Sequence, residues 1–145
     1  MRFDVENQLS SGQSFTGAAT VSTHSYEKQT AAQDLSIGRL MCAVFYPTVA
    51  AGSGSTHTFE VIQADAANLT GNVEVLATVV VLAANLTVGD KVVLPIPQGV
   101  MSRKYIGVRN SISGGTATIT FDAYFMPLDE VEAYKSFPKV VNAAT

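Results

Sequence analysis

The sequence predicts an all-β protein built as an antiparallel two-sheet sandwich or jelly roll, and three observations support that class. Apolar and polar residues alternate with a period of two far more often than with the helical period. Segments rich in Gly, Asn and Ser interrupt this pattern at intervals of roughly 8 to 17 residues, as turns do between short strands. No intervening segment has the pattern of a crossover helix, so a parallel α/β sheet is not expected.

The clearest strand lies near the end of the chain, between Thr116 and Phe125. Its odd positions are apolar, and its even positions are Thr, Asp and Tyr. Such alternation is typical of an antiparallel strand with one face in the core. It places Ile119, Phe121 and Ala123 on the inward face.

The remaining strands follow from the same alternation. In chain order they are predicted at residues 15–23, 39–46, 56–64, 73–81, 90–96 and 104–110. The polar segment 24–37 is expected to cross from one sheet to the other and to carry a short strand around residues 25–27. Turn-forming residues fill the gaps at 50–55, 68–72, 88–90 and 113–115.

Both ends of the chain depart from the strand pattern. We predict a single domain in 145 residues, with an N-terminal arm at 1–10, the sandwich at 11–126 and a C-terminal extension at 127–145. Within the extension, residues 127–135 have acidic side chains early and Lys135 late, which favours a short helix. Pro138 ends it.

Composition narrows the possible partners. The chain is 47% hydrophobic and 14% charged, which predicts a folded domain rather than a disordered one. Its net charge is −3 without a run of Lys or Arg, so no nucleic-acid partner is expected. The most apolar window, 79–84, is too short to span a bilayer, and the first residues show no secretory signal. We therefore expect no membrane partner, and synthesis in a reducing cytoplasm.

Residues that could perform chemistry are few and poorly placed for it. Cys42 is the only cysteine and sits in an apolar run, which indicates a small buried side chain. His24 and His57 lack the spacing of a metal site, and no Gly-x-Ser-x-Gly motif is present. The sequence predicts no catalytic residue, no metal site and no cofactor, so the protein is not expected to be an enzyme.

Two groups of residues are candidates for contact with another protein. The first is a basic and aromatic cluster made by Arg103, Lys104, Tyr105 and Arg109, because Arg and Tyr are enriched at interfaces. Its alternative interpretation is a charged strand edge that discourages pairing between sheets. The second group lies on the arms and comprises Arg2, Phe3, Tyr134 and Phe137. Arms with aromatic side chains are suited to anchoring on a partner.

Several fragments, in their order and spacing, match a known family. They include Phe3-Asp4, Asn7-Gln8-Leu9-Ser10, Leu94-Pro95 with Gly99-Val100, and Tyr105-Ile106-Gly107-Val108. Over nearly its full length the chain resembles the jelly-roll capsid cement, or decoration, proteins of tailed bacteriophages. It departs from them in the long polar crossover at 24–30 and in the extension after Phe125.

The resemblance implies a structural role on a virion. A cement protein binds the outer capsid surface, bridges adjacent subunits of the major capsid protein and stabilises the expanded shell. It further implies synthesis in the cytoplasm of a bacterial host and self-association, for which we favour a homodimer over a trimer. The alternative is another β-module of the virion, from a tail, a fibre or a host-binding protein. An enzyme or a carbohydrate-binding domain is a third, less favoured interpretation.

Overall fold

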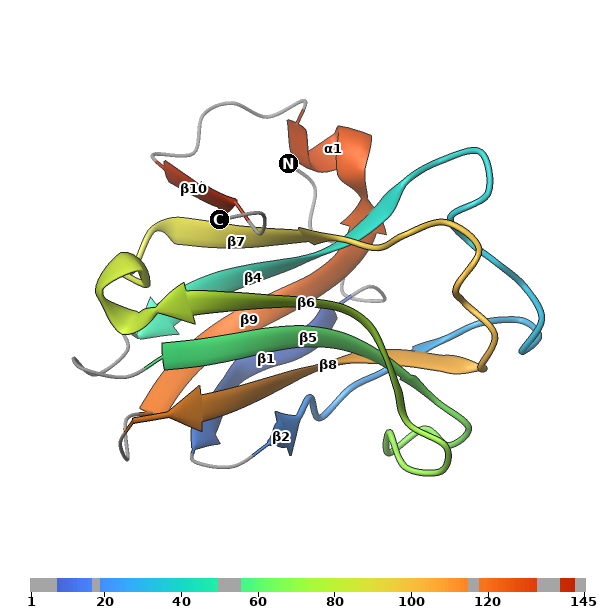
Figure 1. Ribbon diagram of the computed structural model, residues 1–145, viewed down its shortest axis with the longest axis horizontal. Coiled ribbons are helices and arrows are strands. Elements are labelled where there is room, and N and C mark those ends of the chain that lie inside the picture. The colour runs from blue at the N-terminus through green and yellow to red at the C-terminus, as the bar shows by residue number, and fades with distance from the viewer. Residues whose placement is uncertain (1–7, 17–18, 50–55, 115–117, 133–138, 143–145) are drawn as a thin grey trace.

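Two β-sheets packed face to face make up the described part of the chain (Figure 1). The computed structural model describes residues 8–16, 19–49, 56–114, 118–132 and 139–142; at 132 and 139–142 only the backbone is described. The strands of the first sheet are β1 (Gln8–Thr16), β4 (Met41–Val49), β7 (Asp90–Pro95), β9 (Thr118–Pro127) and β10 (Lys139–Asn142). Those of the second are β2 (Thr20–Val21), β3 (Tyr26–Glu27), β5 (Thr56–Ala64), β6 (Glu74–Leu82) and β8 (Tyr105–Ser113).

The strand order confirms the predicted all-β, two-sheet sandwich. The first sheet runs β1-β9-β4-β7-β10 and the second β2-β8-β5-β6, with β3 also paired to β8. All pairs are antiparallel except β10 with β7, which run parallel. Successive strands alternate between the sheets at several connections, an order compatible with the jelly roll that the resemblance implies. A short 3-10 helix, η2 (Ala83–Asn85), and one α-helix, α1 (Leu128–Glu132), complete the described elements.

Most predicted elements lie within a few residues of their observed positions. The strand predicted at 56–64 is β5 without any shift, and the short strand expected around 25–27 is β3. The predicted C-terminal helix is present as α1, with Asp129 and Glu130 in its first turn. The remainder of that prediction, residues 133–138, lies outside the described residues.

The N-terminal boundary was wrong. The first strand begins at Gln8 rather than at residue 15, and β2 is a separate short strand. Leu9 is buried in the core, and the Ser10 hydroxyl donates a hydrogen bond of 2.8 Å to the Phe121 carbonyl. Register shifts near Gly12, which has φ +61°, interrupt the alternation that would have revealed the strand. Of the predicted arm at 1–10, only residues 1–7 remain, and they lie outside the described residues.

One proline lies inside a strand of the first sheet. β4 continues through Pro47, whereas the prediction ended at Tyr46. Pairing of β4 with β7 reaches only Phe45, so Pro47 needs no ladder donor on that side.

At the C-terminus, β10 was not predicted because four residues beyond Pro138 show no diagnostic alternation. Its pairing with β7 makes part of the predicted extension a strand of the sheet.

Aromatic side chains fill the space between the sheets. Phe121 stacks on Phe15 with ring centroids 4.1 Å apart, and it contacts Phe45 and Phe59 edge-on, both at 5.5 Å. Ile119, Phe121 and Ala123 are all fully buried, which confirms the inward face predicted for β9. The core therefore joins both sheets through one aromatic cluster.

A second apolar cluster covers the outer face of the first sheet. Its members are Cys42, Val44, Val93, Met126 and Val131, with Tyr124 and Leu128 packed against them. Cys42 is buried as predicted. Because Ala43 and Phe45 face the inner core, β4 is buried on both faces.

Candidate interaction surface

The predicted basic and aromatic cluster lies along β8 and the loop that precedes it. Arg103 and Lys104 precede the strand, Tyr105 begins it, and Arg109 lies farther along it. The other four predicted contact residues, Arg2, Phe3, Tyr134 and Phe137, lie outside the described residues. Their proposed contacts therefore stay predictions.

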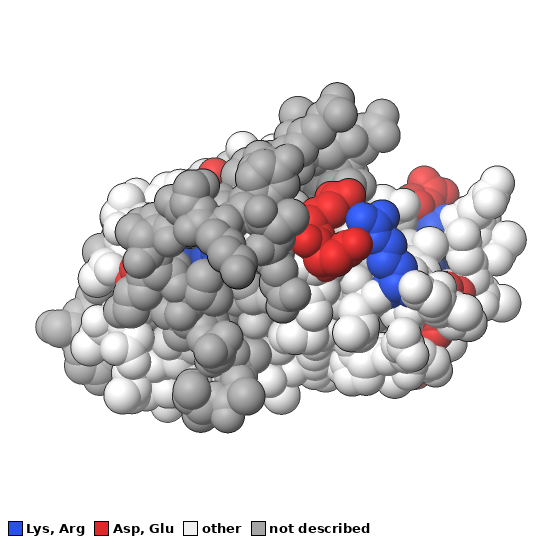
Figure 2. All heavy atoms as spheres, turned by 90° about the horizontal axis from the view of Figure 1, so that it is seen from above, with Lys and Arg blue, Asp and Glu red and all other residues white. Residues whose placement is uncertain are grey.

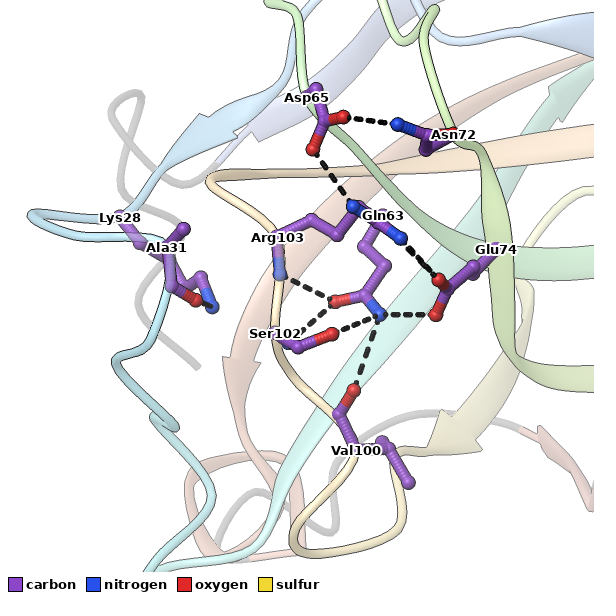
Figure 3. A network of polar contacts seen from close by, with 9 residues as sticks. All are labelled: Lys28, Ala31, Gln63, Asp65, Asn72, Glu74, Val100, Ser102 and Arg103. Carbon is purple, nitrogen blue, oxygen red and sulfur yellow. Dashed lines mark hydrogen bonds and ion pairs between the residues drawn. The ribbon is translucent and has the colours of Figure 1, made fainter.

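Arg103 binds two carboxylates that flank the β5–β6 connection (Figure 3). Its Nη2 lies 2.6 Å from Glu74 Oε1, and its Nη1 lies 3.2 Å from Asp65 Oδ1. Asn72 donates a further hydrogen bond of 2.7 Å to the second oxygen of Asp65. Arg103 therefore links the loop before β8 to both ends of the β5–β6 connection.

Gln63 anchors the same loop from inside the protein. It is fully buried on β5, and its Oε1 accepts the backbone N–H groups of Ser102 at 2.8 Å and Arg103 at 3.1 Å. Its Nε2 donates to Val100 O, Ser102 Oγ and Glu74 Oε2 (Figure 3). This role of Gln63 was not predicted, because a glutamine within a strand pattern carries no sign of it.

The hydrogen bonds around Arg103 shift the pKa values of its two carboxylate partners. Hydrogen bonds from Asn72 and Arg103 lower the pKa of Asp65 below its ordinary value. Hydrogen bonds from Arg103 and Gln63 likewise lower the pKa of Glu74. Both carboxylates are therefore ionised at neutral pH, and with the guanidinium of Arg103 they leave a negative net charge on the cluster.

Lys104 and Tyr105 also have partners within the chain. Lys104 Nζ lies 3.0 Å from Glu27 Oε1 on β3 and 5.9 Å from the centre of the Tyr105 ring. The hydrogen bond from Lys104 to Glu27 raises the pKa of Lys104. Tyr105 itself packs against an apolar cluster made by Ile62, Ala64 and Leu69.

Arg109 forms a cross-strand pair with Glu60. The two residues lie directly opposite each other on β8 and β5, with 2.9 Å between Arg109 Nε and Glu60 Oε1. A cross-strand pair of opposite charge contributes about 0.2 to 1 kcal/mol. Because β8 is paired with β5 on one side and with β2 and β3 on the other, it is not an edge strand. The alternative interpretation of these charges as edge protection is therefore wrong.

Leu69 closes the outer face of the second sheet next to Tyr105. It is buried although its backbone has φ 60°, a conformation that is uncommon for leucine. Its side chain lies over Gly107 of β8, where a Cβ atom would be 2.8 Å from Leu69 Cδ2 and nearer still to Cδ1. The absence of a side chain at Gly107 is what admits Leu69.

A buried lysine orders the loop between β3 and β4. Lys28 Nζ donates hydrogen bonds of 2.9 Å to Ala31 O and 2.6 Å to Gln33 O. Burial lowers the pKa of Lys28, and the nearby Asp34 carboxylate opposes this shift. Ile37, at 75% exposure, lies farther along the same loop and is the more exposed of its two exposed large apolar side chains, the other being Leu40.

The side of the molecule that carries α1 and β10 shows mixed charge. There, Arg39 lies 3.1 Å from Asp129 and 3.4 Å from Glu130, which joins the segment before β4 to α1. Figure 2, which looks onto this side, shows acidic and basic side chains next to each other in its described part. The described surface therefore presents ion pairs here rather than a patch of one sign.

The two histidines lie in different environments. His24 is exposed between β2 and β3, whereas His57 is fully buried on β5. Burial lowers the pKa of His57, and its interaction with Asn110 opposes this shift. Among the described residues, no three His, Cys, Asp or Glu side chains are grouped as metal ligands would be. Within the same residues, no helix has the length and apolar character needed to cross a bilayer.

Comparison with known proteins identifies a family. The protein-family model described as Bbp16 matches residues 9–125, from the start of β1 to near the end of β9. The match therefore includes strands of both sheets and all four described residues of the predicted contact cluster. No curated protein matches the chain.

Proposed function

The chain belongs to the Bbp16 family, a phage-related family, and from this premise we propose that it is a capsid cement protein. In this role it binds the outer surface of the capsid and bridges adjacent subunits of the major capsid protein, which stabilises the shell. The observation that carries the proposal is the family match across both sheets, together with the resemblance described above. The protein acts as a structural component and not as an enzyme.

The form of the described surface supports a binding role. Arg103, Lys104 and Arg109 each have an acidic partner within the chain, so these three side chains are held in place before any docking. A paired, rigid surface loses little side-chain freedom when it docks. We propose that Tyr105 and the partly exposed faces of these ion pairs contact the major capsid protein, and that Arg2, Phe3, Tyr134 and Phe137 add contacts from the two ends of the chain.

Self-association is a further part of the proposal. A capsid presents local two-fold and three-fold axes, and closed symmetry is the usual form of a repeated small subunit. We favour a homodimer, with a trimer as the alternative.

Co-sedimentation tests the proposed function. The full chain is mixed with expanded capsids that lack it, and separately with purified tails of the same phage. Saturable pelleting with capsids alone is the expected result. Pelleting with tails alone supports the other candidate, a tail, fibre or host-binding module, and pelleting with neither contradicts both.

A further inference from the structure

β6 ends the second sheet on one side, and this edge strand is nine residues long. At β1, residues of the β2 region cover the edge: Gln13 donates to Val21 O at 2.8 Å, and the His24 amide donates to Leu9 O at 3.2 Å. The remaining edge strands, β10 and β2, have only four and two residues. Along β6, by contrast, β5 lies on one side and no described strand lies on the other (Figure 1).

From Ala77 to Leu82, the β6 edge also lacks the features that normally prevent pairing. Natural edge strands are protected by charged side chains, prolines, bulges or short length. β6 spans nine residues, and from Val75 to Leu82 it contains no charged residue, no proline and no glycine. Its one irregularity lies near Leu76, where the register to β5 shifts, so Ala77–Leu82 forms a regular ladder.

Exposed apolar side chains accompany this open edge. Val79 and Val81 point into the core, whereas Val80 and Leu82 are 56% and 59% exposed on the outer face. Thr78 shares that face, because it pairs with Glu60 as Val80 pairs with Thr58. Within the described part of the chain, the strand therefore combines an edge that no other strand pairs with and an apolar outer side.

We propose that β6 pairs antiparallel with β6 of a second copy of this chain across a two-fold axis. Centring the pair on Val80 places Val80 against its counterpart and Leu82 against Thr78 of the other copy. The sheet β2-β8-β5-β6 would then continue through the dimer. This pairing specifies the surface through which the proposed homodimer forms. It rests on the proposed self-association and does not depend on capsid binding.

Charge favours a second copy as the partner. Glu74 is the only charged residue of β6, and it is already bound to Arg103 at 2.6 Å. In an antiparallel pair centred on Val80, the two Glu74 side chains lie at opposite ends of the interface, so they do not repel each other. An uncharged strand can thus pair with its own copy without charge repulsion. The two-fold arrangement pairs the β6 edges of both copies at the same time.

Sedimentation of the purified chain without capsids tests this pairing. We expect a wild-type dimer, and Val80→Lys should raise its dissociation constant at least about tenfold, because two like charges would face each other. Val49→Lys is the matched control, since Val49 is also 56% exposed but lies on β4 of the other sheet. Circular dichroism should show both variants folded.

A cross-link gives a second measurement. Residues directly opposite in an antiparallel pair have Cα atoms about 4.5 to 5.5 Å apart, which suits a disulfide. Val80→Cys should therefore form a covalent dimer under oxidation, whereas Val49→Cys should not. Cys42 is buried and does not interfere.

The two proposals fail separately. A wild-type monomer or trimer overturns the β6 pairing, as does a dimer that both lysine variants weaken equally or that Val80→Cys does not cross-link. Each of these outcomes leaves capsid binding to be decided by co-sedimentation. Loss of capsid binding by a chain that still dimerises through β6 would contradict the cement role alone.

Discussion

Phe121 is the residue on which the two sheets depend most. It is fully buried and contacts the rings of Phe15, Phe45 and Phe59. Phe121→Ala should lower the free energy of unfolding by about 3 to 5 kcal/mol, because it removes a large side chain and leaves a cavity. Chemical denaturation measures this change.

The neighbouring threonine is the control for Phe121. Thr120 lies on the opposite face of β9, where its hydroxyl shares a 2.9 Å hydrogen bond with Ser14 at the surface. Thr120→Ala should change stability by less than about 0.5 kcal/mol. Equal losses for the two variants would contradict the assigned faces of β9.

Gly107 and Leu69 form a second residue-scale test. A methyl group at position 107 would overlap the Leu69 side chain, so Gly107→Ala should cost about 1 to 3 kcal/mol. In a Leu69→Ala background the overlap is absent, and the same change should cost much less. Denaturation of the two single variants and the double variant measures the coupling. Additive effects would show that Leu69 does not lie over Gly107.

At the residue scale, the burial of side chains could be predicted where polar and apolar residues alternate. Contacts between residues distant in sequence could not. The inward positions of β9 and the burial of Cys42 follow from local pattern. The role of Gln63 does not, because its partners Val100, Ser102 and Arg103 are distant in sequence. The acidic partners of the basic cluster were missed for the same reason.

At the element scale, Arg103 holds three segments together by charge. The pKa values of Asp65 and Glu74 are lowered in the folded protein, so their stabilising contribution is present above the ordinary carboxyl range and is lost as pH falls through the lowered values. Arg103→Met should therefore reduce the melting temperature at neutral pH. The difference from wild type should shrink below about pH 4.

A second arginine provides the control for this pH dependence. Arg39 pairs with Asp129 and Glu130, but its side chain is 51% exposed, against 28% for Arg103. Exposed pairs contribute little, so Arg39→Met should leave the melting temperature nearly unchanged. A difference between Arg103→Met and wild type that is constant with pH would contradict the role of the carboxylates.

The N-terminal strand offers a test of the corrected boundary. Deleting residues 1–7 leaves β1 intact, whereas deleting 1–10 also removes the buried Leu9 and the hydrogen bond from Ser10 to Phe121. The longer deletion should lower the melting temperature clearly more than the shorter one. Equal melting temperatures would support the arm at 1–10 that the sequence predicted.

Element boundaries show where sequence reasoning reached its limit. Alternation located β5 without error and most other strands within a few residues. The first strand was predicted at 15–23 and overlaps β1 only at residues 15 and 16, because bulges near Gly12 disrupt the period of β1. β10 was missed because only its pairing with β7 defines it. The predicted two-sheet class is correct despite these errors, since it depends on the number and spacing of strands rather than on their ends.

At the scale of the whole molecule, we predict that the ends of the chain contribute to capsid adhesion. The chain without residues 1–7, and a Tyr134→Ala, Phe137→Ala variant, should fold and yet pellet less with expanded capsids. Aromatic anchors contribute much of the energy at such interfaces. Deletion of the whole extension is a poorer test, because Val131 packs against Cys42, Val44 and Met126.

Circular dichroism of each variant is the control for that experiment. Folded variants that bind as wild type would contradict a role for the ends and would place adhesion on the sandwich surface. Arg103, Lys104 and Tyr105 would then be the first residues to substitute. The choice is between two surfaces of one binding protein, so neither result bears on the fold.

A reconstruction of the phage virion tests the central claim most directly. The proposed function predicts density for this sandwich on the outer face of the capsid, in contact with adjacent subunits of the major capsid protein. If β6 pairs as inferred, two copies should share one sheet across a two-fold axis. Density for the domain in the tail or a fibre, with none on the capsid, would contradict the cement role.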